Sequence, residues 1–405
     1  MHTPPTDDIY TRLGVKRRIN AAGTLTRLGG AIMAPEVLAA MVAAARCSVD
    51  IGELQAAASR VIARITGAEA GIVTTGASAA LTLAAAASMT RWDIAKMAAL
   101  PHADGFAHEI LLPRTHYTGY AHALRAAGAR LVDIGHNDRG TGAGVRGIEP
   151  WEIEAAITAR TAAFAFAANP ISLGDLPTVV AVCKPRGIPV IVDAAAQLPP
   201  KSNLRRLFEL GADLVAFSGG KAIGGPQASG ILAGRRDLVG AALVQQLDMD
   251  VAPETWAPPE LIDRAALNGV PHHGLGRGFK AGKEEIAGLL AALERFANAD
   301  DAAADAAMQA RLRHIATMLA GLPGISTQLT PASETGRVPQ LRLLIDAAAA
   351  HIDALALSRA LQSADIPVHL SERFAHQGIL IIDPQVLQPD DEAELVAAVK
   401  RVLRA

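Results

Sequence analysis

Residues 161–221 read TAAFAFAANPISLGDLPTVVAVCKPRGIPVIVDAAAQLPPKSNLRRLFELGADLVAFSGGK, and this stretch decides the fold class. Short apolar runs typical of buried strands alternate here with segments that have helical periodicity. The expected elements are, in order, a strand over 161–168, a helix over 176–187, a strand over 188–196, a helix over 203–211 and a strand over 212–221. Strands that alternate with helices of this length predict an α/β fold with a mostly parallel sheet and helices on both faces.

The pattern continues on both sides of this stretch and then changes. Upstream, we expect a strand over 70–75, a helix over 77–89, a strand over 128–135 and a helix over 149–158. Downstream, the sequence has a Pro-rich break over 256–260 and a Gly-rich basic segment over 271–285. A long helical pattern over 284–320 follows. In the tail we expect strands over 337–346 and 378–383 and helices over 352–364 and 390–404. We therefore expect an N-terminal segment over 1–45, which wraps the core or a partner subunit, a large domain over 46–270, and a linker helix with a small C-terminal α+β domain over 271–405.

Composition narrows the class of protein. The 405 residues include 38 Lys+Arg and 40 Asp+Glu, and a net charge of -2 argues against a dedicated nucleic-acid or membrane-surface binder. Two cysteines, Cys47 and Cys183, exclude a disulfide scaffold and a four-cysteine zinc site. The charge-free stretch 70–90 contains glycines and hydroxyl side chains, so we expect no membrane span there. The N-terminus shows no signal pattern, and we expect a cytoplasmic protein without a metal.

The first segment with chemical potential is TTGASAAL (74–81), a strand followed by a turn of small residues and a helix. The backbone amides of Gly76, Ala77 and Ser78 would be directed at whatever lies at the helix end. Unpaired amides and the helix dipole favour an anion there, typically a phosphate. The alternative is a glycine turn in which Ser or Thr caps a helix.

Two further residues follow strand ends in the same predicted sheet. Asp193 ends an apolar strand, where the carboxyl ends of strands face the ligand crevice of an open α/β sheet. Lys221 lies just past another strand, in FSGGKAIGGPQASG (217–230), where burial would lower the pKa of its amine and make it nucleophilic. Ser218 is placed to donate to the same anion. The alternatives are a helix N-cap or ion pair for Asp193 and an exposed lysine for Lys221.

The three features together fit the requirements of pyridoxal 5'-phosphate. Its phosphate needs a helix N-terminus, its pyridine nitrogen needs an acid to stay protonated, and its aldehyde needs a lysine with which to form a Schiff base. An anion-binding turn, an Asp at a strand end and a Lys at a later strand end occur in that order in this chain. The constellation predicts a pyridoxal-phosphate site.

Longer segments narrow the comparison to one family. The chain resembles the selenocysteine-synthase-like family of fold-type I pyridoxal-phosphate enzymes, which includes L-seryl-tRNA(Sec) selenium transferases and D-glucosaminate-6-phosphate ammonia-lyases. The segments that carry the resemblance are INAAGTLTRLGG (19–30), DIGELQAAASRVIARITGAEAGIVTTGASAAL (50–81), LPRTHYTGYAHALRAAGARLVDIG (112–135), DAAAQLPPKSNL (193–204), FSGGKAIGGPQASGIL (217–232) and GRGFKAGKEEIAGLL (276–290).

The resemblance implies a role for each matching residue. Lys221 becomes the Schiff-base lysine and Asp193 the partner of the pyridine nitrogen. The remaining cofactor-binding residues would be Gly76, Ala77, Ser78 and Ser218 at the phosphate, His116 stacked on the ring and Gln197 at the phenolic oxygen. For His116 the alternative is a histidine that is hydrogen-bonded within a loop. Candidate substrate-binding residues are Arg277, Arg373, Asn20 and Gln227, since a guanidinium matches a carboxylate as a two-point fork.

The activity expected from the resemblance is α,β-elimination on a small amino acid or amino-sugar acid, of the ammonia-lyase or dehydratase type. Transfer, racemisation or aldol cleavage on the same lysine-bound cofactor is the alternative among enzymes. A non-catalytic binding protein that kept the fold is the alternative outside them. We expect a homodimer or higher homo-oligomer, in which the segment 271–283 contributes to a neighbour's phosphate pocket, and no nucleic-acid or membrane partner.

Overall fold

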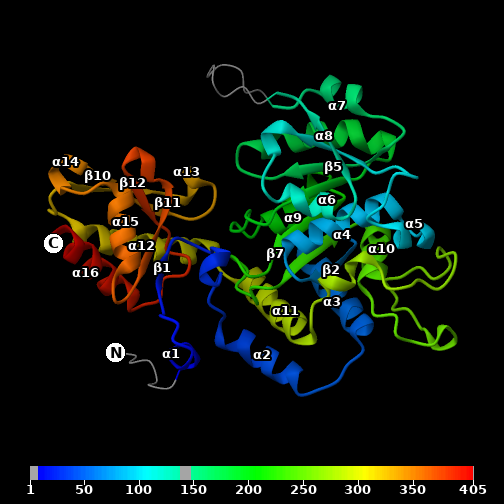
Figure 1. Ribbon diagram of the computed structural model, residues 1–405, viewed down its shortest axis with the longest axis horizontal. Helices are drawn as coiled ribbons and strands as arrows, with labels where there is room; N and C mark the ends of the chain where they lie inside the picture. The colour runs from blue at the N-terminus through cyan, green and yellow to red at the C-terminus, as the bar shows by residue number, and fades with distance from the viewer. Residues whose placement is uncertain (1–7, 137–146, 405) are drawn as a thin grey trace. The chain divides into compact units, whose positions relative to one another are not determined.

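The computed structural model describes residues 8–136 and 147–404. The chain packs into two compact units, both drawn in Figure 1. The large unit comprises 33–298, and the small unit combines the chain up to Ile32 with the chain from Ala299 onward. These boundaries differ from the predicted 1–45, 46–270 and 271–405, because 33–45 and 271–298 both pack in the large unit.

The large unit is built on a seven-stranded sheet with the order β2-β8-β7-β6-β5-β3-β4. Strand β8 runs antiparallel to both of its neighbours, and the remaining pairs are parallel, which confirms the predicted mostly parallel sheet. The strands are β2 (Ala70–Thr74), β3 (Glu109–Pro113), β4 (Arg130–Ile134), β5 (Thr161–Ala167), β6 (Val190–Asp193), β7 (Leu214–Ser218) and β8 (Gly230–Gly234). The helices are α2 (Pro35–Ala45), α3 (Ile51–Thr66), α4 (Ala77–Thr90), α5 (Ile94–Ala99), α6 (Ala121–Ala126), α7 (Pro150–Ala156), α8 (Leu176–Cys183), α9 (Asn203–Glu209), α10 (Arg236–Gln246) and α11 (Lys283–Asn298).

Alternate residues of each central strand enter two different cores. In β5, Ala163 and Ala165 face a cluster that includes the alanines of α4, whereas Phe164 and Phe166 face the cluster on the opposite side. Both faces are buried because a parallel sheet needs helices on each side. Small side chains toward α4 let that helix lie close to the sheet, as the alanine-rich composition suggests.

Two strands of this sheet have no clear signature in the sequence. Strand β8 has glycine at both ends, and glycine is disfavoured in strands, so its pattern indicates a loop. Strand β3 is a short apolar run that periodicity alone does not distinguish from a helix. Each is held as a strand by its neighbours, β2 and β7 for β8, and β4 and β5 for β3.

The apolar stretch 70–90 is divided between β2 and α4, with the turn at Gly76 between them. Among the described residues, no helix has both the length and the apolar character needed to cross a bilayer. The stretch is buried inside the large unit instead, where its side chains form part of the core.

The small unit contains a five-stranded sheet with the order β1-β11-β12-β10-β9. Its N-terminal strand β1 (Ile19–Ala21) pairs in parallel with β11, so this part of the N-terminal segment is a strand of the small unit. The other strands are β9 (Ile325–Thr330), β10 (Gln340–Ile345), β11 (Val368–Phe374) and β12 (Ile379–Ile382). The helices are α1 (Ile9–Arg12), α12 (Asp301–Leu319), α13 (Ala332–Thr335), α14 (Ala347–Ala350), α15 (Ala354–Ser363) and α16 (Asp391–Arg404).

The helical pattern over 284–320 forms two helices, α11 and α12, and not one. Asp300 is the reason, because its carboxylate accepts hydrogen bonds from the amides of Ala302 at 2.9 Å and Ala303 at 3.1 Å. An Asp in this position satisfies the free N–H groups of a new helix. The break lies at the boundary between the two units.

Candidate active site

The candidate site begins at the turn between β2 and α4. Gly76 is the N-cap of α4, and no side-chain hydrogen bond caps this helix in the described part of the chain. The Gly76 backbone has φ +114°, and no atom lies within 4 Å of where a Cβ would stand. The first amides of a helix have no partner within the helix, and the helix dipole adds a positive potential at this end of α4. An open turn at the start of a helix suits an anion, and the role of Gly76, Ala77 and Ser78 in phosphate binding remains a prediction.

The sheet brings this turn next to the end of β7. Gly230 pairs with Thr74 on one side and with Ser218 on the other, so the three residues form one row across the sheet. A Cβ on Gly230 would lie 2.4 Å from the carbonyl carbon of Gly76. Only glycine allows the turn to pass so close over β8. Ser218 and Gly76 therefore lie at the same end of their strands.

Lys221 follows β7 in a tightly packed double loop. Gly219 donates its N–H to the Ser229 carbonyl at 2.9 Å, and Gly225 donates to the Gly219 carbonyl at 2.9 Å. A Cβ on Gly220 would lie 2.4 Å from the Cα of Gln227. The glycines of the SGGK and GGPQ segments thus let two backbone stretches touch, and Lys221 is half-buried on the resulting rigid loop.

Asp193 ends β6, two strands from β8, and its environment couples it to Lys221. Its Oδ1 accepts a hydrogen bond from the Ala195 amide at 3.0 Å. Burial raises the pKa of Asp193 above its ordinary value, while the Ala195 amide and the positive charge of Lys221 lower that pKa in part. Strands β6 and β7 are neighbours and run parallel, so Asp193 and Lys221 follow adjacent strand ends, and their roles at a cofactor remain predictions.

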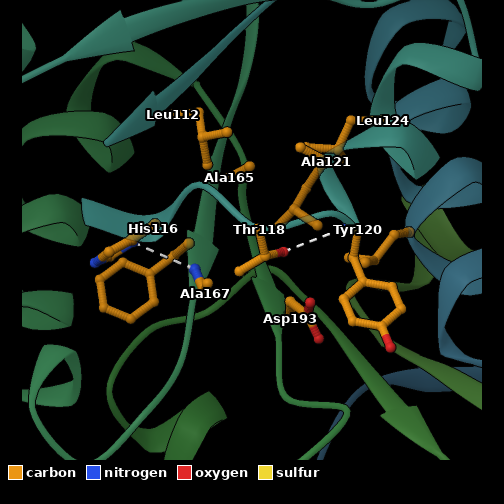
Figure 2. Close-up of a pocket in the computed structure, with 12 residues that line it drawn as sticks. Leu112, His116, Thr118, Tyr120, Ala121, Leu124, Ala165, Ala167 and Asp193 are labelled. Carbon is orange, nitrogen blue, oxygen red and sulfur yellow. Dashed lines mark hydrogen bonds between the residues drawn. The ribbon is translucent and has the colours of Figure 1, made fainter. Parts of the chain in front are cut away.

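Asp193 lines a small pocket of about 30 Å³, shown in Figure 2. His116, which follows β3, lines the same pocket and accepts a hydrogen bond at Nδ1 from the Ala167 amide at 3.3 Å. Its ring packs edge-on against Phe166 at 4.5 Å between centroids. Burial lowers the pKa of His116 to about 4, so the ring is neutral at pH 7 and carries its proton on Nε2.

The donor set fits pyridoxal phosphate. An open helix N-terminus suits the phosphate, a buried carboxyl suits the pyridine nitrogen, and a lysine near that carboxyl suits the aldehyde. The pocket beside Asp193 is apolar on its other walls, with Leu81, Leu112 and Ile191 among its lining residues. These groups follow the ends of strands in one sheet of the large unit.

Gln197 and Gln227 lie in loops next to these groups. Gln197 is part of the turn after β6, where its amide donates to the Ala194 carbonyl at 3.1 Å and its carbonyl accepts from Asn203 at 2.7 Å. Its side chain is half-buried, and that of Gln227 is exposed. Their predicted contacts with cofactor and substrate remain predictions.

Arg277 is held by the protein itself. Its guanidinium pairs with Asp248 at 2.5 Å, and it lines a second cavity, separate from the Asp193 pocket, together with Lys280 and Gln246. A substrate carboxylate would have to compete with Asp248 for this arginine.

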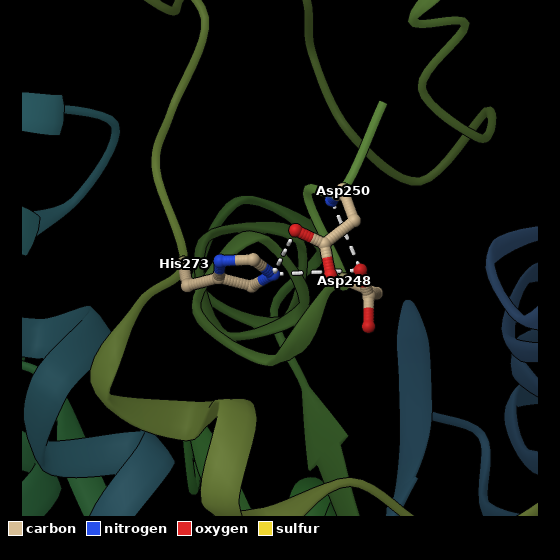
Figure 3. Close-up of side chains that lie close together, drawn as sticks. All are labelled: Asp248, Asp250 and His273. Carbon is tan, nitrogen blue, oxygen red and sulfur yellow. Dashed lines mark hydrogen bonds and ion pairs between the residues drawn. The ribbon is translucent and has the colours of Figure 1, made fainter. Parts of the chain in front are cut away.

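Asp248 also belongs to an exposed cluster with Asp250 and His273, shown in Figure 3. Possible ligand atoms of the three residues lie within 4.8 Å of one another. The His273 Nε2, however, accepts a hydrogen bond from the Met249 amide at 3.0 Å, and Asp248 is engaged by Arg277. Hydrogen bonds within the protein therefore account for the cluster.

Asn20 and Arg373 belong to the small unit. The side chain of Asn20 is used in its own turn, where it donates to the Gly23 carbonyl at 2.9 Å and accepts from the Ala22 amide at 3.0 Å. Arg373 is exposed at the end of β11, with its guanidinium 5.7 Å from the centre of the Phe374 ring. Their substrate-binding roles remain predictions.

Sequence reasoning missed two residues that line the Asp193 pocket, Thr118 and Tyr120. Figure 2 shows both near Asp193, and the Thr118 hydroxyl accepts from the Tyr120 amide at 3.2 Å. The available signal was the concentration of polar and aromatic side chains in THYTGY, directly after the predicted ring-stacking His116.

Comparisons with known proteins identify the family and its relatives. The description Aminotransferase class-V applies to the family whose sequence model matches residues 46–360. The chain is 29% identical to D-glucosaminate-6-phosphate ammonia lyase of Salmonella typhimurium, with 98% of each protein covered, and 30% identical to a 5'-C-glycyluridine monooxygenase-decarboxylase of a Streptomyces species, with 97% and 92% covered. A solved structure of D-glucosaminate-6-phosphate ammonia-lyase superposes with a TM-score of 0.81 at 28% identity, over 98% of this chain and 99% of that one.

Proposed function

The chain belongs to the aminotransferase class-V family, and on that premise we propose that it is a pyridoxal-phosphate-dependent ammonia-lyase acting on an amino acid or amino-sugar acid. The observation that carries the proposal is that Asp193 and Lys221 follow the ends of the neighbouring parallel strands β6 and β7, in the same sheet as the turn at Gly76. The similarity to an ammonia-lyase over nearly the whole of both chains supports the reaction class.

Each residue of the site has a role in the proposal. The amides of Gly76, Ala77 and Ser78, with the Ser218 hydroxyl, bind the phosphate. Asp193 keeps the pyridine nitrogen protonated. The raised pKa of the Asp193 carboxyl reflects its burial, which favours a proton shared between the carboxyl and the nitrogen. Neutral His116 offers an uncharged ring to the cofactor, and Lys221 provides the amine that binds it covalently.

Pyridoxal phosphate, when bound, supplies an electron sink for charge at the substrate α-carbon. The substrate amine would take the place of Lys221 on the aldehyde, and the freed Lys221 would act as general base, with its Nζ accepting the α-proton. A hydroxyl on the β-carbon leaves as water, and one water is taken up again when the C–N bond is cleaved. The net products are a keto acid, deoxygenated at the β-carbon, and ammonia.

Cofactor attachment is tested directly on the purified protein. Reduction with borohydride followed by peptide mapping should find the cofactor on Lys221 and on none of the other lysines. Lys221→Ala should abolish the visible absorbance of the bound cofactor, and the exposed Lys184→Ala should leave it unchanged. An adduct on another lysine would contradict the assignment.

The reaction is tested with a panel of 3-hydroxy amino acids and amino-sugar acids. Elimination yields ammonia and keto acid in equal amounts, whereas racemisation scrambles enantiomers without either product. The similarity to a monooxygenase-decarboxylase favours a second candidate reaction, oxidative decarboxylation, which consumes oxygen and releases carbon dioxide. An oxygen electrode therefore distinguishes the two: consumption without keto-acid formation would overturn the lyase proposal.

A further inference from the structure

A buried hydrogen-bond network closes the open edge of the sheet beside the anion-binding turn. Strand β2 is an edge strand, and its outer backbone groups are bound by side chains of α3. Ser59 accepts from the Gly71 amide at 3.1 Å, and the Gln55 amide both accepts from Val73 N–H at 2.9 Å and donates to the Val73 carbonyl at 2.8 Å. The helix rises about 6 Å from Gln55 to Ser59, and the strand advances about 6.6 Å from Gly71 to Val73. The two side chains therefore have the same spacing as the two backbone positions that they bind. Helix α3 replaces a neighbouring strand.

Gln246, at the end of α10, extends this network. Its Oε1 accepts from Gln55 at 3.3 Å, and its Nε2 donates to the Val73 carbonyl at 3.2 Å and to the Phe279 carbonyl at 2.8 Å. A reversed Gln246 amide would direct its oxygen at two carbonyl oxygens, so the neighbours determine its orientation. Both hydrogens of this buried amide are used. One binds Val73 of β2, and the other joins α10 to the segment that precedes α11.

The network ends at the turn itself. The Phe279 carbonyl, bound by Gln246, also accepts from the Thr75 amide at 3.3 Å and from the Thr75 hydroxyl at 3.3 Å. Thr75 directly precedes Gly76, the N-cap of α4. The position of Gly76 thus depends on a carbonyl whose shortest bond comes from Gln246.

We propose that Gln246 is a positioning residue that sets the affinity of the turn 76–78 for the phosphate of pyridoxal phosphate, an inference that rests on the function proposed above. Gln246 touches neither the turn nor the cofactor. It fixes the Phe279 carbonyl, which holds Thr75 so that the following amides converge on one anion. Without Gln246, the buried Val73 carbonyl and the half-buried Phe279 carbonyl each lose a donor, and Thr75 is held by its own long bonds alone.

The test compares pyridoxal 5'-phosphate with pyridoxal, which has the same ring and aldehyde but no phosphate. Both are titrated into the full-length protein after removal of its cofactor, and absorbance of the lysine adduct gives each Kd. Gln246→Met keeps the side-chain length and removes the donors. We expect about a tenfold higher Kd for pyridoxal phosphate, equivalent to about 1.4 kcal/mol, and an unchanged Kd for pyridoxal.

Gln245→Met is the matched control, because Gln245 is fully buried on the same helix and its amide bonds Thr90 at 3.5 Å, away from the turn. It should leave the ratio of the two Kd values as in the wild type. A second pair of variants changes Thr75. Because this side chain is exposed, we expect its substitutions to leave folding intact. Thr75→Ala should weaken pyridoxal phosphate selectively, and Thr75→Ser should restore its affinity.

Equal weakening of both ligands by Gln246→Met, or no weakening of either, would overturn the positioning role while leaving the proposed function intact. The same selective loss in Gln245→Met would overturn it as well. If Gln246→Met does not fold, the Thr75 pair decides: an unchanged ratio in Thr75→Ala contradicts the proposal. A wild-type protein that forms no adduct with either ligand refutes the proposed function, and the inference with it.

Discussion

His116 shows how burial fixes the charge of one side chain in the site. The ring is buried against Phe166, and its Nδ1 is occupied by the Ala167 amide. Burial disfavours the charged form and lowers the pKa of His116 to about 4 from the ordinary 6.5. The residue therefore presents a neutral ring at pH 7.

This shift makes folding stability depend on pH. Between pH 6.5 and about 4 the unfolded chain binds a proton at His116 and the folded chain does not, so stability falls as pH falls through that window. Relative to His116→Phe, the wild type without cofactor should lose about 3 kcal/mol of unfolding free energy across it. Urea unfolding at a series of pH values measures this difference. Parallel curves for the two proteins would contradict it.

Strand β8 and the start of α4 meet at a contact that only backbone atoms can make. Gly230 lies between Thr74 and Ser218, and its missing side chain leaves room for the Gly76–Ala77 peptide. The anion-binding turn thus owes its position to a glycine in a neighbouring strand as well as to its own sequence.

Gly230→Ala should displace the turn. A Cβ 2.4 Å from the Gly76 carbonyl carbon forces a backbone shift, and overpacking of this kind costs about 1–3 kcal/mol. We expect lower unfolding free energy and weaker pyridoxal-phosphate binding together. Gly278→Ala is the control, because nothing lies within 4 Å of its Cβ position. Native stability and affinity in Gly230→Ala would show that the turn tolerates the shift.

In the molecule as a whole, every residue that we propose to hold the cofactor lies in the large unit, between Gly76 and Lys221. The strands that end at the site, β2, β6 and β7, belong to its seven-stranded sheet. A ligand stabilises the unit that binds it, and the gain in free energy rises with the logarithm of the ligand concentration divided by Kd.

Hydrogen exchange with and without pyridoxal phosphate should locate this stabilisation. At about 100 times Kd, ligand binding adds about 2.7 kcal/mol to the stability of the unit that binds it. We expect slower exchange in α4, β6 and β7, with β9 and β10 of the small unit unchanged. Protection confined to the small unit would contradict the assignment of the site to the large one.

The sequence by itself determined the α/β class, the family resemblance and the order of turn, acid and lysine. These follow from local information: apolar runs of strand length, helical periodicity, and glycines beside Ser218 and Lys221. The same locality explains the failures. Strand β8 is held by its neighbours in the sheet. The helical pattern over 284–320 predicted one helix, which the capping side chain of Asp300 divides into two.

Only the tertiary structure decided which of the selected residues lie together. It placed Asp193 and Lys221 after the ends of neighbouring strands and Ser218 in one row with Thr74, because sheet register aligns residues far apart in sequence. It engaged Arg277 with Asp248, used Asn20 in its own turn, and joined Gln55, Gln246 and Phe279 behind the anion-binding turn. Hydrogen bonds and burial between distant segments have no periodic signature, so the folded chain alone reveals them.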